Sequence, residues 1–335
     1  MHVWQISSFG IDALEFAERP SPEPGRGQIL IRVHAISFNF RDLLMITGLY
    51  NPKLKLPRIP CSDGAGEVVA VGPGVTQWQP GDRVAGIFMQ NWLDGPPTPE
   101  RVKGALGGDI DGMLAEYVVL HENGVVPIPE HLSFQEAATL PCAAVTAWNA
   151  LSICDIKPGS SVLIQGTGGV SIFALQFARL KGAKVLGISG SDEKLNRALD
   201  LGLDLGVNYN DVPEWDRWAV EQTAEGVDLV IEVGGLGTLP RSLRALRMGG
   251  SIAQVGVLTG VNPTEPLPLA AILHKQARIR GIYVGSRQDF IDMNKAIALT
   301  QLRPVGEDFP WSHAREVLKR LEEGSHFGKL VMTVG

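Results

Sequence analysis

An apolar run that stops at a glycine-rich turn and continues with helical spacing is the feature that most constrains this fold. Residues 162–164 (VLI) lead into Gly166-Thr167-Gly168-Gly169-Val170, and apolar side chains then recur at helical intervals up to Leu180. Such a strand, turn and helix places a pyrophosphate at a helix N-terminus. Ser171 takes the third glycine position of G-x-G-x-x-G and is small enough for helix and strand to pack. These residues therefore predict a dinucleotide-binding turn.

The sequence around this turn alternates between strand and helix patterns from about residue 133 onward. Apolar β-type runs such as AKVLGIS, DLVIEVGG, SIAQVGV and ARIRGIYVG are separated by helical stretches such as DEKLNRALDLG. This alternation predicts a parallel, doubly wound α/β sheet. The first 125 residues instead carry short β-branched runs between dense Gly/Pro clusters, which predicts a small β-barrel.

Size and charge exclude several function classes. The chain has 335 residues, enough for two domains, and a formal net charge of −6 without a basic cluster, so we expect no nucleic-acid or membrane partner. The N-terminus lacks the pattern of a signal peptide, and no apolar run approaches membrane-spanning length. Three scattered cysteines favour a reducing, cytoplasmic environment over a disulfide framework.

A long polar stretch interrupts the β-rich part of the chain at residues 89–112. Long loops in compact domains are often functional, so this loop borders a binding site or is a solvated surface excursion. The sequence leaves both alternatives open.

The end of the second predicted Rossmann strand indicates which dinucleotide is bound. An acidic residue at this point binds the ribose 2′-hydroxyl of NAD, whereas this chain has Ser189, followed by Lys194. Serine accommodates a 2′-phosphate and lysine neutralises its charge, so the sequence favours NADPH. The adjacent Asp192 and Glu193 complicate this prediction, but acids are common in the first turn of a helix.

Several motifs in order along the whole chain resemble those of the medium-chain dehydrogenase/reductase superfamily, on its zinc-free, quinone-oxidoreductase-like and zinc-type alcohol dehydrogenase-like side. They are NFRDLLMITGLY (39–50), DGAGEVVAVG (63–72), PGDRV (80–84), AATLPCAAVTAW (137–148), GTGGVS (166–171) and HFGKLV (326–331). The resemblance implies a GroES-like β-barrel catalytic domain over residues 1–130, a Rossmann NADP-binding domain over 131–281, and a return to the catalytic domain over 282–335.

The same resemblance allows the zinc positions of the alcohol dehydrogenases to be located in this sequence. The three ligand positions fall on Asn39, the pair Ser62-Asp63, and Cys142. A credible site needs three strong protein ligands, so we expect no metal, although Asp63 could contribute one ligand. Arg41 replaces the Ser/Thr that relays the alcohol proton in the zinc branch.

The resemblance also implies roles for individual residues. Tyr50 matches a proton donor of enoyl-thioester reductases. Asn39 would orient substrate or nicotinamide, and Asp42 would fix Arg41 or the loop backbone. The structural alternatives are a tyrosine packed at the loop rim, a turn asparagine and a helix-capping aspartate. Besides the glycine turn, the implied cofactor contacts are Thr146, Ser189, Lys194, Tyr209, Val233, Gly234, Gly256, Val257, Tyr283, Val284 and Lys329. An apolar substrate pocket would use Phe40, Leu44, Trp92, Leu93, Trp148 and Tyr283.

These predictions together favour an NADPH-dependent reductase of quinones, enones or related α,β-unsaturated carbonyls that transfers hydride without a metal. The alternatives are an alcohol or aldehyde dehydrogenase of the same superfamily and a catalytically idle NADPH-binding protein. The resemblance further implies a homodimer, and the strand near residues 277–285 with the preceding segment 262–276 is the candidate interface.

Overall fold

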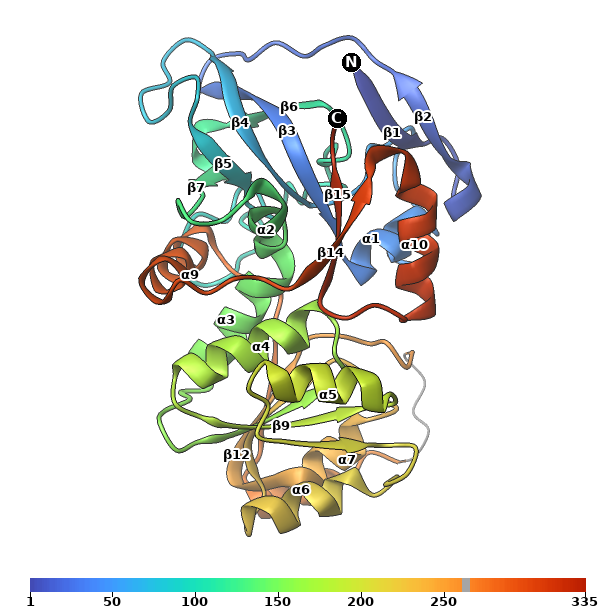
Figure 1. The fold of residues 1–335 in the computed structure, drawn as a ribbon, viewed down its shortest axis with the longest axis vertical. Coiled ribbons are helices and arrows are strands. Elements are labelled where there is room, and N and C mark those ends of the chain that lie inside the picture. Colours follow the sequence, from blue (N-terminus) through green and yellow to red (C-terminus); the bar gives the residue numbers. More distant parts are fainter. Residues whose placement is uncertain (261–265) are drawn as a thin grey trace. The chain divides into compact units, whose positions relative to one another are not determined.

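The computed structural model describes residues 1–260 and 266–335, and the chain forms two compact units. Unit 1 comprises residues Met1–Val145 and Val284–Gly335, and unit 2 comprises Thr146–Tyr283. The GroES-like and Rossmann architectures predicted from the sequence are both present, one in each unit (Figure 1). No helix in the described part of the chain is long and apolar enough to cross a bilayer.

Unit 1 is built around a seven-stranded sheet of order β14-β15-β3-β4-β5-β7, with β6 paired to β3. The long strand β3 lies antiparallel to β4, β6 and β15, so the C-terminal strand closes the sheet that the N-terminal part begins. The strands of this sheet are β3 (Gln28–Phe38), β4 (Asp63–Val71), β5 (Arg83–Gly86), β6 (Tyr117–His121), β7 (Val125–Pro127), β14 (Gly306–Pro310) and β15 (Lys329–Thr333). The strands β1 (His2–Ile6) and β2 (Leu14–Glu18) form a separate antiparallel pair.

Helices pack around this sheet and share its core. The core joins apolar side chains of β3, β4 and β15 to those of α1 and α10. The helices are α1 (Phe40–Ile46), α2 (Phe134–Ala138), α9 (Arg287–Thr300) and α10 (Ala314–Glu323), with the short helices η1 (Ile11–Ala13), η2 (Glu122–Gly124), η3 (Leu140–Ala144) and η4 (Trp311–His313).

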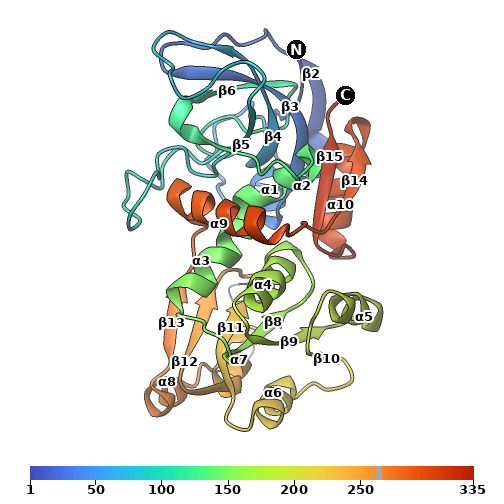
Figure 2. The same cartoon turned by 60° about the vertical axis from the view of Figure 1, so that its left-hand side comes forward.

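Unit 2 contains a six-stranded sheet of order β10-β9-β8-β11-β12-β13, in which every pairing is parallel. This is the doubly wound order, with its switch point between β8 and β11. Helices α4 and α5 cover one face of the sheet, and α6 and α7 cover the other (Figures 1 and 2). The elements are α3 (Val145–Ile153), β8 (Ser161–Gln165), α4 (Gly169–Leu180), β9 (Lys184–Ser189), α5 (Asp192–Asp200), β10 (Leu205–Asn208), α6 (Trp215–Thr223), β11 (Val227–Glu232), α7 (Leu239–Ala245), β12 (Leu246–Gln254), α8 (Leu269–Lys275) and β13 (Arg278–Gly281).

The boundary between the units lies further along the chain than the expected residue 130. Helix α2 contacts β3 and β4 of the barrel. The ring of Phe134 stacks on His34 at 4.4 Å and lies 4.7 Å from the Arg83 guanidinium carbon. These contacts attach residues 131–145 to unit 1, and the return to this unit begins at Val284 rather than at residue 282.

The first helical stretch after residue 133 is interrupted in the structure. Helix α2 ends at Ala138, a π-helical turn covers Leu140–Ala144, and α3 follows. Pro141 lies at the start of this turn and has no N–H for an α-helical bond, which explains the local widening.

The candidate dimer segment is only partly described. Residues 261–265 lie outside the described residues. Strand β13 is the edge strand of the six-stranded sheet, and all four of its residues are exposed. The exposed Leu269 and Leu273 lie on the neighbouring helix α8. An exposed strand edge beside apolar side chains is compatible with the predicted interface, which stays a prediction.

Candidate functional site

In unit 1, the start of α1 carries Asn39, Arg41 and Asp42. The buried Asp42 carboxylate accepts a hydrogen bond from the Asn39 backbone N–H at 2.8 Å, and its other oxygen lies 3.7 Å from the Arg41 guanidinium. Asp42 therefore fixes both the loop backbone and Arg41. Because it is fully buried, we treat it as a positioning residue rather than a catalytic one.

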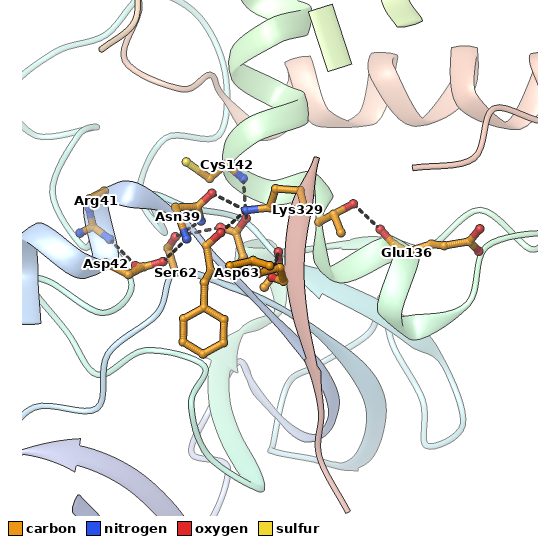
Figure 3. Close-up of polar contacts among 12 residues, drawn as sticks. Asn39, Arg41, Asp42, Ser62, Asp63, Glu136, Cys142 and Lys329 are labelled. Atoms are coloured by element: carbon orange, nitrogen blue, oxygen red, sulfur yellow. Dashed lines mark hydrogen bonds and ion pairs between the residues drawn. The ribbon is translucent and has the colours of Figure 1, made fainter. Parts of the chain in front are cut away.

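A buried polar cluster joins this helix start to β4 and β15 (Figure 3). The Lys329 ammonium donates to the side-chain oxygen of Asn39 at 2.6 Å and to the Phe38 carbonyl at 2.5 Å, and it lies 3.9 Å from Asp63. The Asp63 carboxylate also accepts from the Ser62 hydroxyl at 2.8 Å and from the Cys142 backbone N–H at 3.2 Å. The cluster thus pairs one cation with one carboxylate inside the unit.

Burial determines the protonation behaviour of this cluster. Desolvation raises the pKa of Asp63, and the Lys329 ammonium opposes that rise. Desolvation likewise raises the pKa of the Cys142 thiol above its ordinary range, and the neighbouring Asp63 carboxylate raises it further. Both effects favour the thiol form of Cys142 over the thiolate, which argues against a role as nucleophile.

Tyr50, at the end of the α1 segment, is 46% exposed. The Arg41 guanidinium carbon lies 5.6 Å from the centre of its ring and 4.5 Å from that of Phe88. Arg41 also donates to the Leu106 carbonyl at 2.9 Å, which connects loop 89–112 to the residues around Tyr50. The loop therefore borders the candidate catalytic residues of unit 1.

In unit 2, the glycine turn has the geometry expected for a pyrophosphate. Gly166 has a φ of 69°, and an added Cβ would find no atom within 4 Å. Helix α4 begins after Gly168 without a capping hydrogen bond from that residue, and the Ser171 hydroxyl donates to the Gln165 carbonyl at 2.7 Å. The serine thus ties helix to strand, and the amides of the first helical turn are available to an anion.

Ser189 and Tyr209 lie together at the ends of β9 and β10. The Tyr209 backbone N–H donates to the Ser189 carbonyl at 3.0 Å, and the Tyr209 hydroxyl lies against Gly190. Lys194 follows in the first turn of α5, while Asp192 accepts a hydrogen bond from the Asn208 amide. The three residues predicted to bind the 2′-phosphate therefore lie near the ends of β9 and β10 and in the first turn of α5.

The other predicted cofactor segments meet at the ends of β11 and β12. The Leu258 backbone N–H donates to the Val233 carbonyl at 3.1 Å, and Gly256 approaches Val233 so closely that a Cβ would lie 2.5 Å from its oxygen. Gly234 and Val257 are adjacent to these contacts in the chain. Thr146, Tyr283 and Val284 lie at the junctions between the units.

Comparison with known proteins identifies the architecture. Residues 25–130 match the family model for the alcohol dehydrogenase GroES-like domain, and residues 169–299 match the model for zinc-binding dehydrogenases. A zinc-type alcohol dehydrogenase-like protein of Schizosaccharomyces pombe is 42% identical over 97% of this chain and 96% of its own length. The chain belongs to the medium-chain dehydrogenase/reductase superfamily. Its members are oxidoreductases that use nicotinamide cofactors.

Two further members of the superfamily carry different functional names. Human quinone oxidoreductase is 30% identical over 93% of this chain and 90% of its own length. The crystal structure of an NAD-dependent alcohol dehydrogenase is 34% identical, with a TM-score of 0.92 and complete coverage of both chains. Superfamily membership alone therefore fixes neither the substrate nor the choice between NAD and NADP.

The residues at the superfamily's zinc positions do not fit a zinc ion in this chain. Asn39 and Ser62 are weak ligands, and the Asp63 carboxylate already accepts hydrogen bonds from the Ser62 hydroxyl and the Cys142 backbone N–H. The Lys329 ammonium, a positive charge, lies beside both Asn39 and Asp63. Within residues 1–260 and 266–335, no three His, Cys, Asp or Glu side chains gather as a metal site would require.

The environment of Lys329 does not support its predicted contact with the cofactor pyrophosphate. Only 3% of the residue is exposed, and its ammonium is already bound to Phe38 and Asn39. An ammonium held in this way would have to leave both partners to reach a dinucleotide.

The predicted substrate pocket is only partly assembled within one unit. Phe40 and Leu44 lie together on α1, whereas Trp92 is buried and donates to the Gly95 carbonyl within loop 89–112. Trp148 belongs to unit 2, where its ring packs edge-on against Phe177 at 5.5 Å. Trp92 and Trp148 therefore have structural partners of their own.

Sequence reasoning missed a buried carboxylate in unit 2, Glu232, at the end of β11. It accepts hydrogen bonds from Gly234 N (2.8 Å), Gly235 N (2.9 Å), Thr238 Oγ1 (2.5 Å), Gln165 Nε2 (2.9 Å) and Ser242 Oγ. These contacts shape the loop that contains Val233 and Gly234. An acidic residue ending the apolar strand DLVIE was the available signal.

Replacing Glu232 with glutamine is expected to lower the free energy of unfolding by about 3 kcal/mol, because the new amide N–H₂ would face donors in a buried site. Urea unfolding at neutral pH measures the change. Glu225→Gln, at an exposed position in the same unit, is the matched control. A loss below about 1 kcal/mol for Glu232→Gln would contradict this account of the loop.

The buried Asp42 is expected to make the free energy of unfolding depend on pH. Burial raises its pKa from 3.8 to about 6, so the folded protein binds more protons than the unfolded chain between these values. The stability that Asp42 contributes is therefore fully present below pH 3.8 and is lost as pH rises through 6. The free energy of unfolding of the wild type, relative to that of Asp42→Asn, should fall by about 3 kcal/mol across this window. Denaturant unfolding at several pH values tests this, and a pH-independent difference would contradict it.

Proposed function

We propose that this protein is an NADPH-dependent oxidoreductase that reduces quinones, enones or related α,β-unsaturated carbonyls by hydride transfer without a metal. The observation that carries the proposal is the buried cluster of Asn39, Asp63 and Lys329, where zinc-dependent members would need metal ligands. Carbonyl polarisation must then come from hydrogen-bond donors.

The choice of NADPH is supported by the end of β9. Ser189 lies where NAD-binding proteins have an acidic residue, and Lys194 is close by on α5. Asp192 bonds to Asn208, so one of the two nearby carboxylates has a structural partner. A dianionic 2′-phosphate would therefore meet a hydroxyl and an ammonium at this strand end.

The residues of unit 1 supply polar groups for the reaction. When bound, the reduced nicotinamide supplies a hydride to the β-carbon of the substrate. The amide N–H of Asn39 and the hydroxyl of Tyr50 would donate to the carbonyl oxygen, and Tyr50 or solvent would give the proton that completes the reduction. Apolar side chains such as Phe40 and Leu44 would contact the carbon skeleton.

An alcohol or aldehyde dehydrogenase is the second candidate, since two of the relatives above carry alcohol dehydrogenase names. Alcohol oxidation requires a group that removes the hydroxyl proton. In the zinc enzymes a Ser or Thr relays this proton, and Arg41 occupies the corresponding position here. A guanidinium stays protonated and cannot accept a proton, which favours the reductase.

Fluorescence titration of the protein with NADPH and NADH tests the proposal first. NADPH should bind at least 10-fold more tightly, and Lys194→Ala should remove most of that preference, whereas Arg197→Ala on the same helix should not. An acceptor screen with quinones, enones and aldehydes then separates the reductase from the dehydrogenase. Equal binding of NADH would contradict the cofactor assignment, and binding without turnover of any acceptor would favour an idle NADPH-binding protein.

We also propose that the protein is a cytoplasmic homodimer that pairs through β13, with a small-molecule carbonyl substrate and no nucleic-acid or membrane partner. The exposed β13 residues and the apolar side chains of α8 support this surface. Light scattering coupled to size-exclusion chromatography measures the assembly state, and a monomer would contradict the proposal.

A further inference from the structure

The Lys329 side chain reaches from β15 into the space between Asn39 and Asp63 (Figure 3). Its ammonium lies 2.6 Å from the Asn39 side-chain oxygen, 2.5 Å from the Phe38 carbonyl oxygen and 3.9 Å from Asp63. Asn39 and Asp63 both occupy positions that correspond to the zinc site of other superfamily members. A cation of the protein itself therefore lies among the residues that replace the metal ligands.

This arrangement determines how the Asn39 amide is oriented. An ammonium has three donors and no acceptor, so it must face the amide oxygen and would repel the amide N–H₂. The hydrogen bond from Lys329 therefore excludes the flipped amide. Asn39 Nδ2 then points away from the ammonium, where the Ser62 hydroxyl oxygen lies 3.4 Å away.

One N–H of Asn39 has no strong partner. Within the described part of the chain, Nδ2 makes the long contact to the Ser62 hydroxyl and a hydrogen bond to the Asp63 carboxylate beside it. The Ser62 hydroxyl donates its own hydrogen to Asp63 at 2.8 Å, so its oxygen can accept only on its other side. The Ser62 and Asp63 oxygens lie 2.8 Å apart, so one N–H of Nδ2 faces both of them. The second N–H of the amide diverges from the first and is left for a ligand.

We propose that Lys329 is a positioning residue that holds the Asn39 amide with an N–H directed to the carbonyl oxygen of the substrate. The inference rests on the proposed reductase function. An amide that accepts a hydrogen bond from an ammonium is also a stronger donor at its nitrogen, since hydrogen bonds in series polarise one another. Lys329 thus supplies part of the electrostatic effect through Asn39, without touching the substrate.

Two variants separate this role from a structural or cofactor-binding role. Asn39→Asp keeps an oxygen for Lys329 and removes the amide donor, whereas Lys329→Met removes the cation and leaves the amide free to turn. Each should lower kcat for enone or quinone reduction by about 10- to 50-fold, because one oriented donor to the oxyanion is lost. The Kd for NADPH, measured by fluorescence titration, should change less than threefold in both.

The double variant Asn39→Asp/Lys329→Met tests the coupling. If Lys329 acts through Asn39, kcat of the double variant should equal that of the slower single variant within about threefold. Multiplied losses in the double variant, or a 10-fold weaker Kd for NADPH in Lys329→Met, would overturn the proposal and favour a direct cofactor contact.

Lys329→Gln is the second variant if Lys329→Met fails to fold, as judged by circular dichroism and melting temperature. It keeps a donor without the charge and should retain more of kcat than Lys329→Met if both fold. Full activity of a folded Lys329→Gln protein together with a slow Asn39→Asp protein would overturn the role of the cation. Failure of the wild type to bind NADPH or to reduce any acceptor would instead overturn the proposed function.

Discussion

Replacing Ser189 with aspartate is expected to weaken NADPH binding by about 100-fold and to leave NADH binding within about threefold of the wild-type value. A carboxylate at this strand end would lie near the 2′-phosphate, and two like charges about 4 Å apart at a protein surface repel by several kcal/mol. NADH has a hydroxyl at that position, which a carboxylate accepts as a hydrogen-bond partner.

The local structure makes Ser189 a suitable position for this test. It is buried at the end of β9, and its backbone carbonyl accepts a hydrogen bond from Tyr209. The serine hydroxyl also accepts from the Ser191 backbone N–H at 3.3 Å, a bond that an aspartate oxygen can replace. The substitution therefore changes charge more than it changes the backbone.

Ser189→Asn is the matched control, because asparagine has the size of aspartate without its charge. Fluorescence titrations with both dinucleotides should show that Ser189→Asn retains the NADPH preference and that Ser189→Asp reverses it. Similar losses of NADPH binding in the two variants would mean that size, not charge, is responsible. Such a result would remove Ser189 from the 2′-phosphate pocket.

Replacing Tyr50 with phenylalanine is expected to lower kcat for enone reduction by about 100-fold, since a positioned proton donor contributes at least this factor. Nearly half of Tyr50 is exposed, and the Arg41 guanidinium lies over its ring. Loss of the hydroxyl alone leaves this cation–π contact in place. Stopped-flow measurement of NADPH oxidation reports the chemical step.

Tyr117→Phe, in strand β6, is the control for loss of a tyrosine hydroxyl elsewhere in unit 1. The Kd for NADPH and the melting temperature should be unchanged in both variants. A decrease in kcat below threefold for Tyr50→Phe would assign the proton to solvent and make Tyr50 a structural residue of the loop.

Local patterns were sufficient to predict most of the fold. The apolar runs ending at Gln165, Ser189 and Glu232 form parallel strands of one sheet, as expected for strands that are buried on both faces. The turn after Gln165 begins with Gly166, whose positive φ explains the glycine at that position. The π-turn at Pro141 and the attachment of α2 to the barrel depend on tertiary contacts such as Phe134 with His34. Periodicity carries no information about such contacts.

The candidate site was predictable in its residue types but not in its pairings. The sequence places Asn39, Asp63 and Cys142 at the superfamily's metal positions, whereas Lys329 lies 290 residues from its partner Asn39. The hydrogen bonds to Glu232 likewise join β8, β11 and α7. Pairings between distant segments arise only when the chain has folded, so a linear motif cannot reveal them.

The most direct test of the account is NADPH oxidation with a quinone or enone by protein that has been treated with a chelator and analysed for metal content. We predict that the protein contains no stoichiometric zinc and that its rate is unchanged by chelation or by added zinc. Activity that disappears on chelation and returns with zinc would contradict the account.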